Sequence, residues 1–140
     1  KPSVVWVFFM NYKIIIVNIF FLLSLLITLV ISLEVYTIKL NNLVSYYALS
    51  TTIPLFILQL VSINKFSRLI RNAKPKLFKK ACIRPNGSEA NSINVASLFD
   101  EKIPFLEMKE KHLIYHWKFT KRVVVYSMLS FLILIILFFI

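Results

Sequence analysis

Two histidines are the residues in this sequence whose type and spacing most resemble part of a metal site. His112 and His116 stand four residues apart in His112-Leu-Ile-Tyr-His116, so a helix would bring both imidazoles to one face. A zinc-type site needs three or four ligands, and the spacing fixes neither Glu107 nor Glu110 as a third one. We therefore expect this pair to lie at a membrane interface, and a metal site at His112 and His116 ranks last among the candidates.

Other catalytic chemistry has little support in the sequence. The single cysteine, Cys82, excludes a disulfide within the chain and any metal site built on a cysteine pair. Membrane desaturases use several His-x-x-x-His boxes, whereas this chain has 2 histidines in all. The sequence contains no phosphate-binding loop and no Cys-x-x-Cys motif. We therefore expect that the chain has no catalytic activity of its own, no catalytic residues and no bound cofactor.

Basic residues recur at helical spacing immediately after the second apolar block. Apolar residues fill the opposite side of the same stretch, which predicts an amphipathic helix that Pro75 ends. A helix with a basic face next to a membrane span commonly lies in the interface plane, where it attracts anionic lipid. The residues predicted to contact cardiolipin or another anionic lipid are Lys65, Arg68, Arg71, Lys74, Lys79 and Lys80. The alternative is that these charges only set the topology.

Small polar residues recur within the first apolar block. Ser24, Thr28 and Ser32 are four residues apart, which predicts a helix face that packs closely against a second helix. The alternative is that each hydroxyl bonds back to its own helix. In the second block, Gln59 is predicted to form a hydrogen bond between helices, and Pro54 should disturb the helix because it lacks a backbone donor.

Three apolar blocks must position all of these residues. They are Ile14–Leu33, Leu43–Ile63 and Val123–Ile140, in a chain that is 59% hydrophobic with a mean hydropathy of +0.77. About 20 apolar residues are enough for a helix to cross the bilayer core. The sequence thus predicts an all-α integral membrane protein with three transmembrane helices. The first two form a hairpin, the third is separate, and an interfacial amphipathic helix lies in a long basic loop.

The chain divides by composition into three segments. Residues 1–63 hold an N-terminal segment and the hairpin, residues 64–122 the basic loop, and residues 123–140 the third span. The loop contains 14 Lys or Arg and 5 Asp or Glu, so the positive-inside rule places it in the cytoplasm or the mitochondrial matrix. Within the loop, a helix is expected from Phe105 onward, with Glu107 and Lys111 paired one turn apart.

The function expected from these features is structural. A small chain with three spans and few catalytic groups fits a non-catalytic accessory subunit of a multi-subunit membrane complex. Its Ile-, Leu-, Phe-, Asn- and Lys-rich composition is typical of AT-rich genes, which are found in organellar genomes, in some nuclear genomes and in some bacteria. Together with the small size and the three spans, it leads us to expect a respiratory-chain or ATP synthase complex of the mitochondrial inner membrane. Its partners would be other membrane subunits and anionic lipids, and not nucleic acid. The alternative is a small transporter or protein-translocation component that acts as an oligomer, with Asn18, Pro54 and Gln59 along its path.

Overall fold

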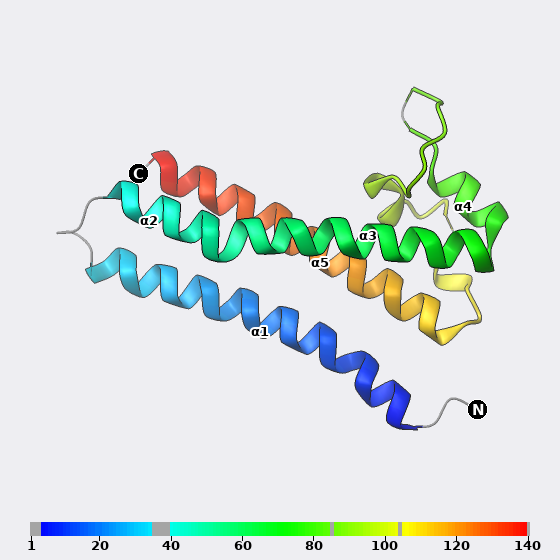
Figure 1. Ribbon diagram of the computed structural model, residues 1–140, viewed down its shortest axis with the longest axis horizontal. Coiled ribbons are helices and arrows are strands. Elements are labelled where there is room, and N and C mark those ends of the chain that lie inside the picture. Colours follow the sequence, from blue (N-terminus) through cyan, green and yellow to red (C-terminus); the bar gives the residue numbers. More distant parts are fainter. Residues whose placement is uncertain (1–3, 35–39, 85, 104, 140) are drawn as a thin grey trace. The chain divides into compact units, whose positions relative to one another are not determined.

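The chain is built from helices. A computed structural model describes residues 4–34, 40–84, 86–103 and 105–139. Regular structure in these ranges is helical, apart from one isolated antiparallel bridge between Ile83 and Glu89. Within these ranges three helices are long and apolar enough to cross a membrane, which agrees with the three predicted blocks and fits an integral membrane protein (Figure 1).

Eight helical elements follow one another along the described chain. Five are α-helices. The other three are short: η2 is a π-helix, and η3 and η4 are 3-10 helices. The elements are α1 (Val4–Glu34), α2 (Leu40–Tyr47), η2 (Ala48–Thr52), α3 (Ile53–Ala73), α4 (Pro75–Ala81), η3 (Val95–Leu98), η4 (Phe105–Glu107) and α5 (Lys111–Phe139). Residues 35–39 of the predicted hairpin link lie outside the described ranges.

The second and third spanning helices extend beyond their apolar blocks. The apolar helical stretches are Tyr12–Ser32, Leu43–Ala73 and Lys111–Phe139. The basic segment after Ile63 therefore continues the second spanning helix, because no Gly or Pro interrupts the sequence before Pro75. Lys74, at φ −141° and ψ 68°, breaks the helix as a residue before proline tends to do, and Pro75 then opens α4.

The chain forms two compact units, and the boundaries between them fall inside α3 and α5. Unit 1 consists of Lys1–Leu58 and Val125–Ile140, and unit 2 of Gln59–Val124. In unit 1, α1 runs in the direction opposite to α2 (Figure 1). Val17 and Phe21 are buried on α1, whereas most of its other described side chains are half-buried or exposed.

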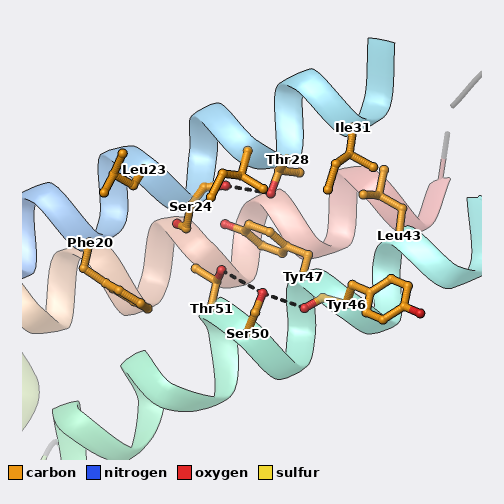
Figure 2. Close-up of a pocket in the computed structure, with 11 residues that line it drawn as sticks. Phe20, Leu23, Ser24, Thr28, Ile31, Leu43, Tyr46, Tyr47, Ser50 and Thr51 are labelled. Carbon is orange, nitrogen blue, oxygen red and sulfur yellow. Dashed lines mark hydrogen bonds between the residues drawn. The ribbon is translucent and has the colours of Figure 1, made fainter. Parts of the chain in front are cut away.

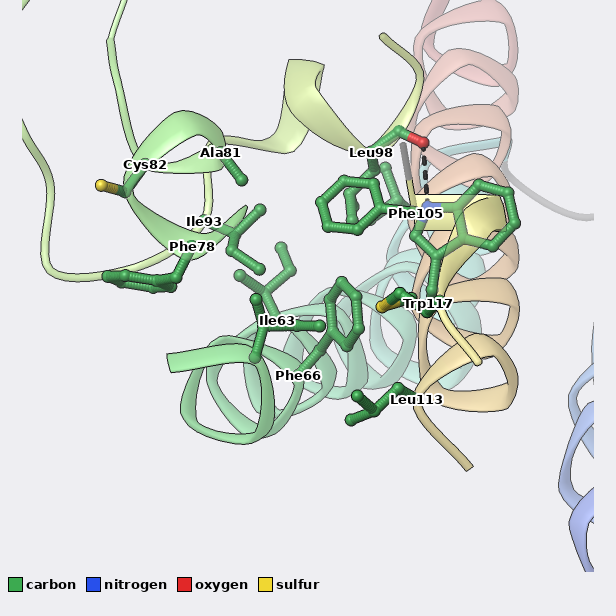
Figure 3. Close-up of a cluster of buried hydrophobic side chains, with 13 residues drawn as sticks. Ile63, Phe66, Phe78, Ala81, Cys82, Ile93, Leu98, Phe105, Leu113 and Trp117 are labelled. Atoms are coloured by element: carbon green, nitrogen blue, oxygen red, sulfur yellow. Dashed lines mark hydrogen bonds between the residues drawn. The ribbon is translucent and has the colours of Figure 1, made fainter. Parts of the chain in front are cut away.

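Unit 2 has a hydrophobic core of its own (Figure 3). The rings of Phe66 and Phe105 lie 5.6 Å apart, and those of Phe105 and Trp117 6.2 Å apart. Other members of the core are Ile63, Ile70, Phe78, Ala81, Cys82, Ile93, Leu98, Met108, Leu113 and Val124. The segment that the sequence presents as a basic loop is therefore folded around buried apolar side chains.

Two hydrogen bonds between side chains and backbone atoms fix the irregular segments of unit 2 onto its helices. The backbone N–H of Ile93 donates to the Ser67 hydroxyl at 2.9 Å, and the Trp117 indole donates to the Leu98 carbonyl at 3.2 Å. Both bonds are buried, so each satisfies a polar group that burial would otherwise leave without a partner. Gly87, at φ 81°, supplies the left-handed residue of the turn in which its N–H donates to the Arg84 carbonyl.

The prediction of a continuous helix from Phe105 onward is wrong at its N-terminal end. Residues 105–107 form a 3-10 turn, and α5 begins at Lys111, so Glu107 and Lys111 do not share a helix. The non-helical residues between these elements place Met108 in the core of unit 2.

Candidate functional site

The basic residues predicted to contact lipid differ in how far they are engaged with the rest of unit 2. Lys65, Arg68, Lys79 and Lys80 are exposed. Arg71 is exposed as well and Lys74 is half-buried, but both have partners in unit 2. Lys65 and Arg68 lie on α3 and Lys79 and Lys80 on α4, where they present positive charge at the surface of unit 2.

Arg71 and Lys74 contact other parts of unit 2. The Arg71 guanidinium donates to the Asn91 carbonyl and lies 4.6 Å from the centre of the Phe78 ring. Lys74 Nζ lies 2.9 Å from Glu110 Oε1. This hydrogen bond with Lys74, aided by the backbone N–H of Glu110, lowers the pKa of the Glu110 carboxyl. These two cations therefore serve the fold of unit 2.

The two histidines lie near the beginning of α5. His112 is exposed and His116 is half-buried, with its ring 5.4 Å from that of Tyr115 in an edge-on arrangement. Within the described ranges, no three His, Cys, Asp or Glu side chains gather where they could hold one metal ion. Lys121, one turn further along α5, lies 5.0 Å from the Phe99 ring and 5.2 Å from the Trp117 ring.

The hydroxyls of the predicted packing face bond within α1. Ser24 donates to the Phe21 carbonyl, Thr28 to the Ser24 carbonyl and Ser32 to the Leu29 carbonyl, each at 2.8 Å. Ser24 and Thr28 are half-buried toward α2 and η2, whereas Ser32 is exposed. Gln59 is half-buried on the part of α3 that belongs to unit 2.

A cavity of about 340 Å³ lies between α1 and the α2–η2 segment (Figure 2). Its walls are apolar and aromatic side chains together with the small residues Ser24, Thr28, Ser50 and Thr51. All of these residues belong to unit 1. The cavity lies within the apolar stretches of two helices, Tyr12–Ser32 and Leu43–Ala73.

The π-helix η2 forms one side of this cavity and has a local cause. Pro54 offers no N–H, and its ring crowds the carbonyl of the residue four positions earlier, Ser50. The backbone widens, and the N–H of Ile53 donates to the carbonyl of Ala48, five residues before it. The Ser50 hydroxyl meanwhile donates to the Tyr46 carbonyl at 2.6 Å. The disturbance predicted at Pro54 thus takes the form of a π turn, which is frequent at functional positions.

Polar contacts between helices of unit 1 involve residues other than the predicted packing face of Ser24, Thr28 and Ser32. The Tyr126 hydroxyl donates to Asn18 Oδ1 at 2.8 Å, and the Tyr126 ring stacks on Phe21 at 4.5 Å. Thr52 and Ser130 form a buried hydroxyl pair at 2.9 Å. The available signal for these contacts was the presence of polar residues in each of the three apolar blocks. A single sequence does not show which of these polar residues form a pair.

Comparison of the chain with protein families, with characterised proteins and with solved structures finds no match. Unit 1 supplies apolar helices joined by polar side chains, and unit 2 supplies a folded and positively charged body.

Proposed function

We propose that the chain is a non-catalytic subunit of a multi-subunit membrane complex. The observation that carries this proposal is the folded core of unit 2. A segment that only connects two spans needs no buried core, whereas a surface for partner subunits must be held in one shape. The exposed apolar side chains along α1 supply further surface for partner helices and lipid.

Purification of the tagged chain in mild detergent tests the proposed role. We expect other membrane proteins to co-migrate with it on a native gel, in constant proportion over repeated preparations. A matched pair of variants adds a test of the unit 2 surface. Lys79→Glu with Lys80→Glu should weaken assembly, whereas Lys13→Glu, an exposed change on α1, should not. A chain that migrates alone, or only with copies of itself, contradicts the proposal.

We further propose that the exposed cations of α3 and α4 contact anionic lipid, such as cardiolipin, on the matrix or cytoplasmic side. Basic residues next to spanning helices favour this side, and each contributes about 1 kcal/mol near an anionic surface. Lys65→Gln with Arg68→Gln should reduce the cardiolipin retained in native mass spectrometry, and Lys102→Gln, an exposed lysine outside these helices, should not. Equal retention in both variants argues against a specific contact.

The membrane that we propose is the mitochondrial inner membrane, in a respiratory-chain or ATP synthase complex. The support is compositional, because 13 Phe and the prevalence of Lys over Arg are typical of AT-rich genes. Fractionation of cells that express the tagged chain tests this location. Recovery in another membrane contradicts it and leaves the proposed subunit role unaffected.

A transporter or translocation component is the second candidate, which the π turn beside Pro54 favours. The substitution Gln59→Leu separates the two. Lost flux in reconstituted vesicles with unchanged assembly supports transport, whereas lost assembly supports a packing role for Gln59.

A further inference from the structure

The chain between α4 and η3 carries an Asn-Gly pair, Asn86 and Gly87, at the tip of a hairpin. Figure 1 shows this part of unit 2 as a narrow loop that turns back on itself. The backbone N–H of Arg84 donates to the Ser88 carbonyl, and that of Gly87 donates to the Arg84 carbonyl, both at 2.9 Å. Asn86, Gly87 and Ser88 are all exposed. The pair is therefore held in a closed turn and is accessible to water.

The side-chain carbonyl of Asn86 accepts two hydrogen bonds, both from Ser88. The Ser88 backbone N–H lies 3.1 Å from Asn86 Oδ1, and the Ser88 hydroxyl lies 2.8 Å from the same oxygen. An asparagine that bonds to the backbone two residues further on is common in turns. Both donors here meet the oxygen on which negative charge develops when a nucleophile attacks Asn86 Cγ. They therefore make this amide carbon more reactive.

The backbone nitrogen of Gly87 is the nucleophile that the chain itself supplies. Its attack on Asn86 Cγ closes a five-membered ring, and glycine hinders this attack least because it has no side chain. At Gly87, φ is 81°, and nothing beyond its chain neighbours lies within 4 Å of where a Cβ would stand. The hydrogen bond from the Gly87 N–H to the Arg84 carbonyl opposes loss of the proton. This bond therefore slows the reaction without blocking access to Cγ.

We propose that Asn86 is a site of spontaneous modification, at which the side-chain amide is converted to a carboxylate. The Gly87 nitrogen loses its proton and bonds to Asn86 Cγ, and the Asn86 side-chain nitrogen takes up a proton and leaves as ammonia. Water then opens the cyclic imide at one of its two carbonyls. Opening at Cγ gives aspartate, and opening at the main-chain carbonyl gives isoaspartate, in which the main chain runs through the former side chain.

The two products change the hairpin in different ways. Aspartate adds a negative charge two residues from Arg84 and still presents an oxygen to the two Ser88 donors. Isoaspartate adds one methylene to the main chain before Gly87. Because the length of a hairpin loop selects its turn, the hydrogen bond between Gly87 and Arg84 no longer fits the longer loop. Conversion therefore lowers the positive charge of this surface of unit 2 and, in one product, opens its hairpin.

Ageing of the purified full-length protein in detergent, at mildly alkaline pH and in water enriched in heavy oxygen, tests the proposal. Peptide mapping by mass spectrometry separates aspartate from isoaspartate and detects the solvent oxygen in each. We expect both products at Asn86 well before any appear at Asn91, which is exposed in the same segment but precedes a serine. Equal conversion at the two positions overturns the proposal. So does an unmodified Asn86 after a time in which the guanidinium-denatured chain has reacted.

A variant tests the contribution of the hairpin geometry and leaves the Asn-Gly pair unchanged. Ser88→Ala removes the hydroxyl that donates to Asn86 Oδ1, so conversion of the folded protein should slow about 2- to 10-fold. Ser92→Ala, the same change further along the segment, should leave the rate as it is. In the denatured chain Ser88→Ala should have no effect, because the turn is lost. Equal rates for folded Ser88→Ala and wild-type protein overturn the activation of Asn86 by Ser88. These outcomes are independent of the proposed subunit role.

Discussion

Thr52 Oγ1 and Ser130 Oγ lie 2.9 Å apart in a buried contact between residues that are 78 positions apart in the chain. Thr52 ends η2, and Ser130 lies within α5. In hydrocarbon neither hydroxyl can bond to water, so each gains from the presence of the other. The pair therefore connects the second and third apolar blocks inside unit 1.

A double-mutant cycle on this pair should show a measurable coupling energy. Thr52→Val and Ser130→Ala each remove one hydroxyl, and the coupling in the free energy of unfolding should be about 0.6 kcal/mol, with about 1.7 kcal/mol as an upper bound. Denaturant titration in mixed micelles measures it. A cycle of Thr52→Val with Ser32→Ala, an exposed position, should give no coupling. Equal coupling in the two cycles would contradict a direct contact.

The Tyr126–Asn18 hydrogen bond should stabilise unit 1 by a similar amount. Tyr126→Phe removes the hydroxyl that donates to Asn18 and keeps the ring that stacks on Phe21. We expect a loss of about 0.6–1.7 kcal/mol in the free energy of unfolding, measured in the same micelles. Tyr12→Phe, at a side chain that is 54% exposed, is the matched control and should change little. A loss of the same size at Tyr12 would attribute the effect to tyrosine in general.

The parts of the fold that were predictable are those set by local sequence. Continuous apolar runs locate the three spanning helices, because a backbone in hydrocarbon must satisfy its own hydrogen bonds. Pro75 ends α3 because its ring and its missing N–H are incompatible with a continuing helix. Pro54 disturbs the helical turn before it for the same reason. The hydroxyls of Ser24 and Thr28 reach carbonyls of their own helix, which is also a local effect.

The parts that were not predictable depend on contacts between distant residues. The core of unit 2 brings Phe66 against Phe105 and Phe105 against Trp117, although these residues are far apart in the sequence. Asn18 and Tyr126 pair over 108 positions. Each of these residues has several polar or aromatic alternatives in the chain, so no spacing selects one partner. A signal for the core was present in Ile93, Leu98 and Phe105, which are apolar residues within the predicted basic loop.

The Ser67 hydroxyl should stabilise the position of the non-helical backbone at Ile93 in unit 2. Its hydroxyl accepts the buried N–H of Ile93 at 2.9 Å, so Ser67→Ala leaves that N–H without its partner. A buried donor without a partner costs about 1–3 kcal/mol. Hydrogen exchange at the Ile93 amide should become faster by a factor that corresponds to this loss. Ser88→Ala, an exposed change in the same unit, should leave that exchange rate as it is.

The Lys74–Glu110 pair should make the stability of unit 2 depend on pH in the acidic range. Lys74 Nζ lies 2.9 Å from Glu110 Oε1, and this contact lowers the pKa of Glu110 below its ordinary value of 4.5. Because the folded state favours the charged carboxylate, the contribution is fully present above 4.5 and is lost as the pH falls through the lowered pKa.

Thermal unfolding in detergent, followed from neutral pH down to about pH 3, measures this dependence. Glu110→Gln should make the curve flatter below the ordinary pKa of glutamate, because the variant has no carboxylate to protonate at this position. Glu107→Gln, at an exposed residue of η4, should keep the slope of the wild-type protein. The effect should be modest, since both members of the pair are partly exposed and screened by solvent. If the two variants flatten the curve equally, the acid sensitivity comes from net charge and not from the contact between Lys74 and Glu110.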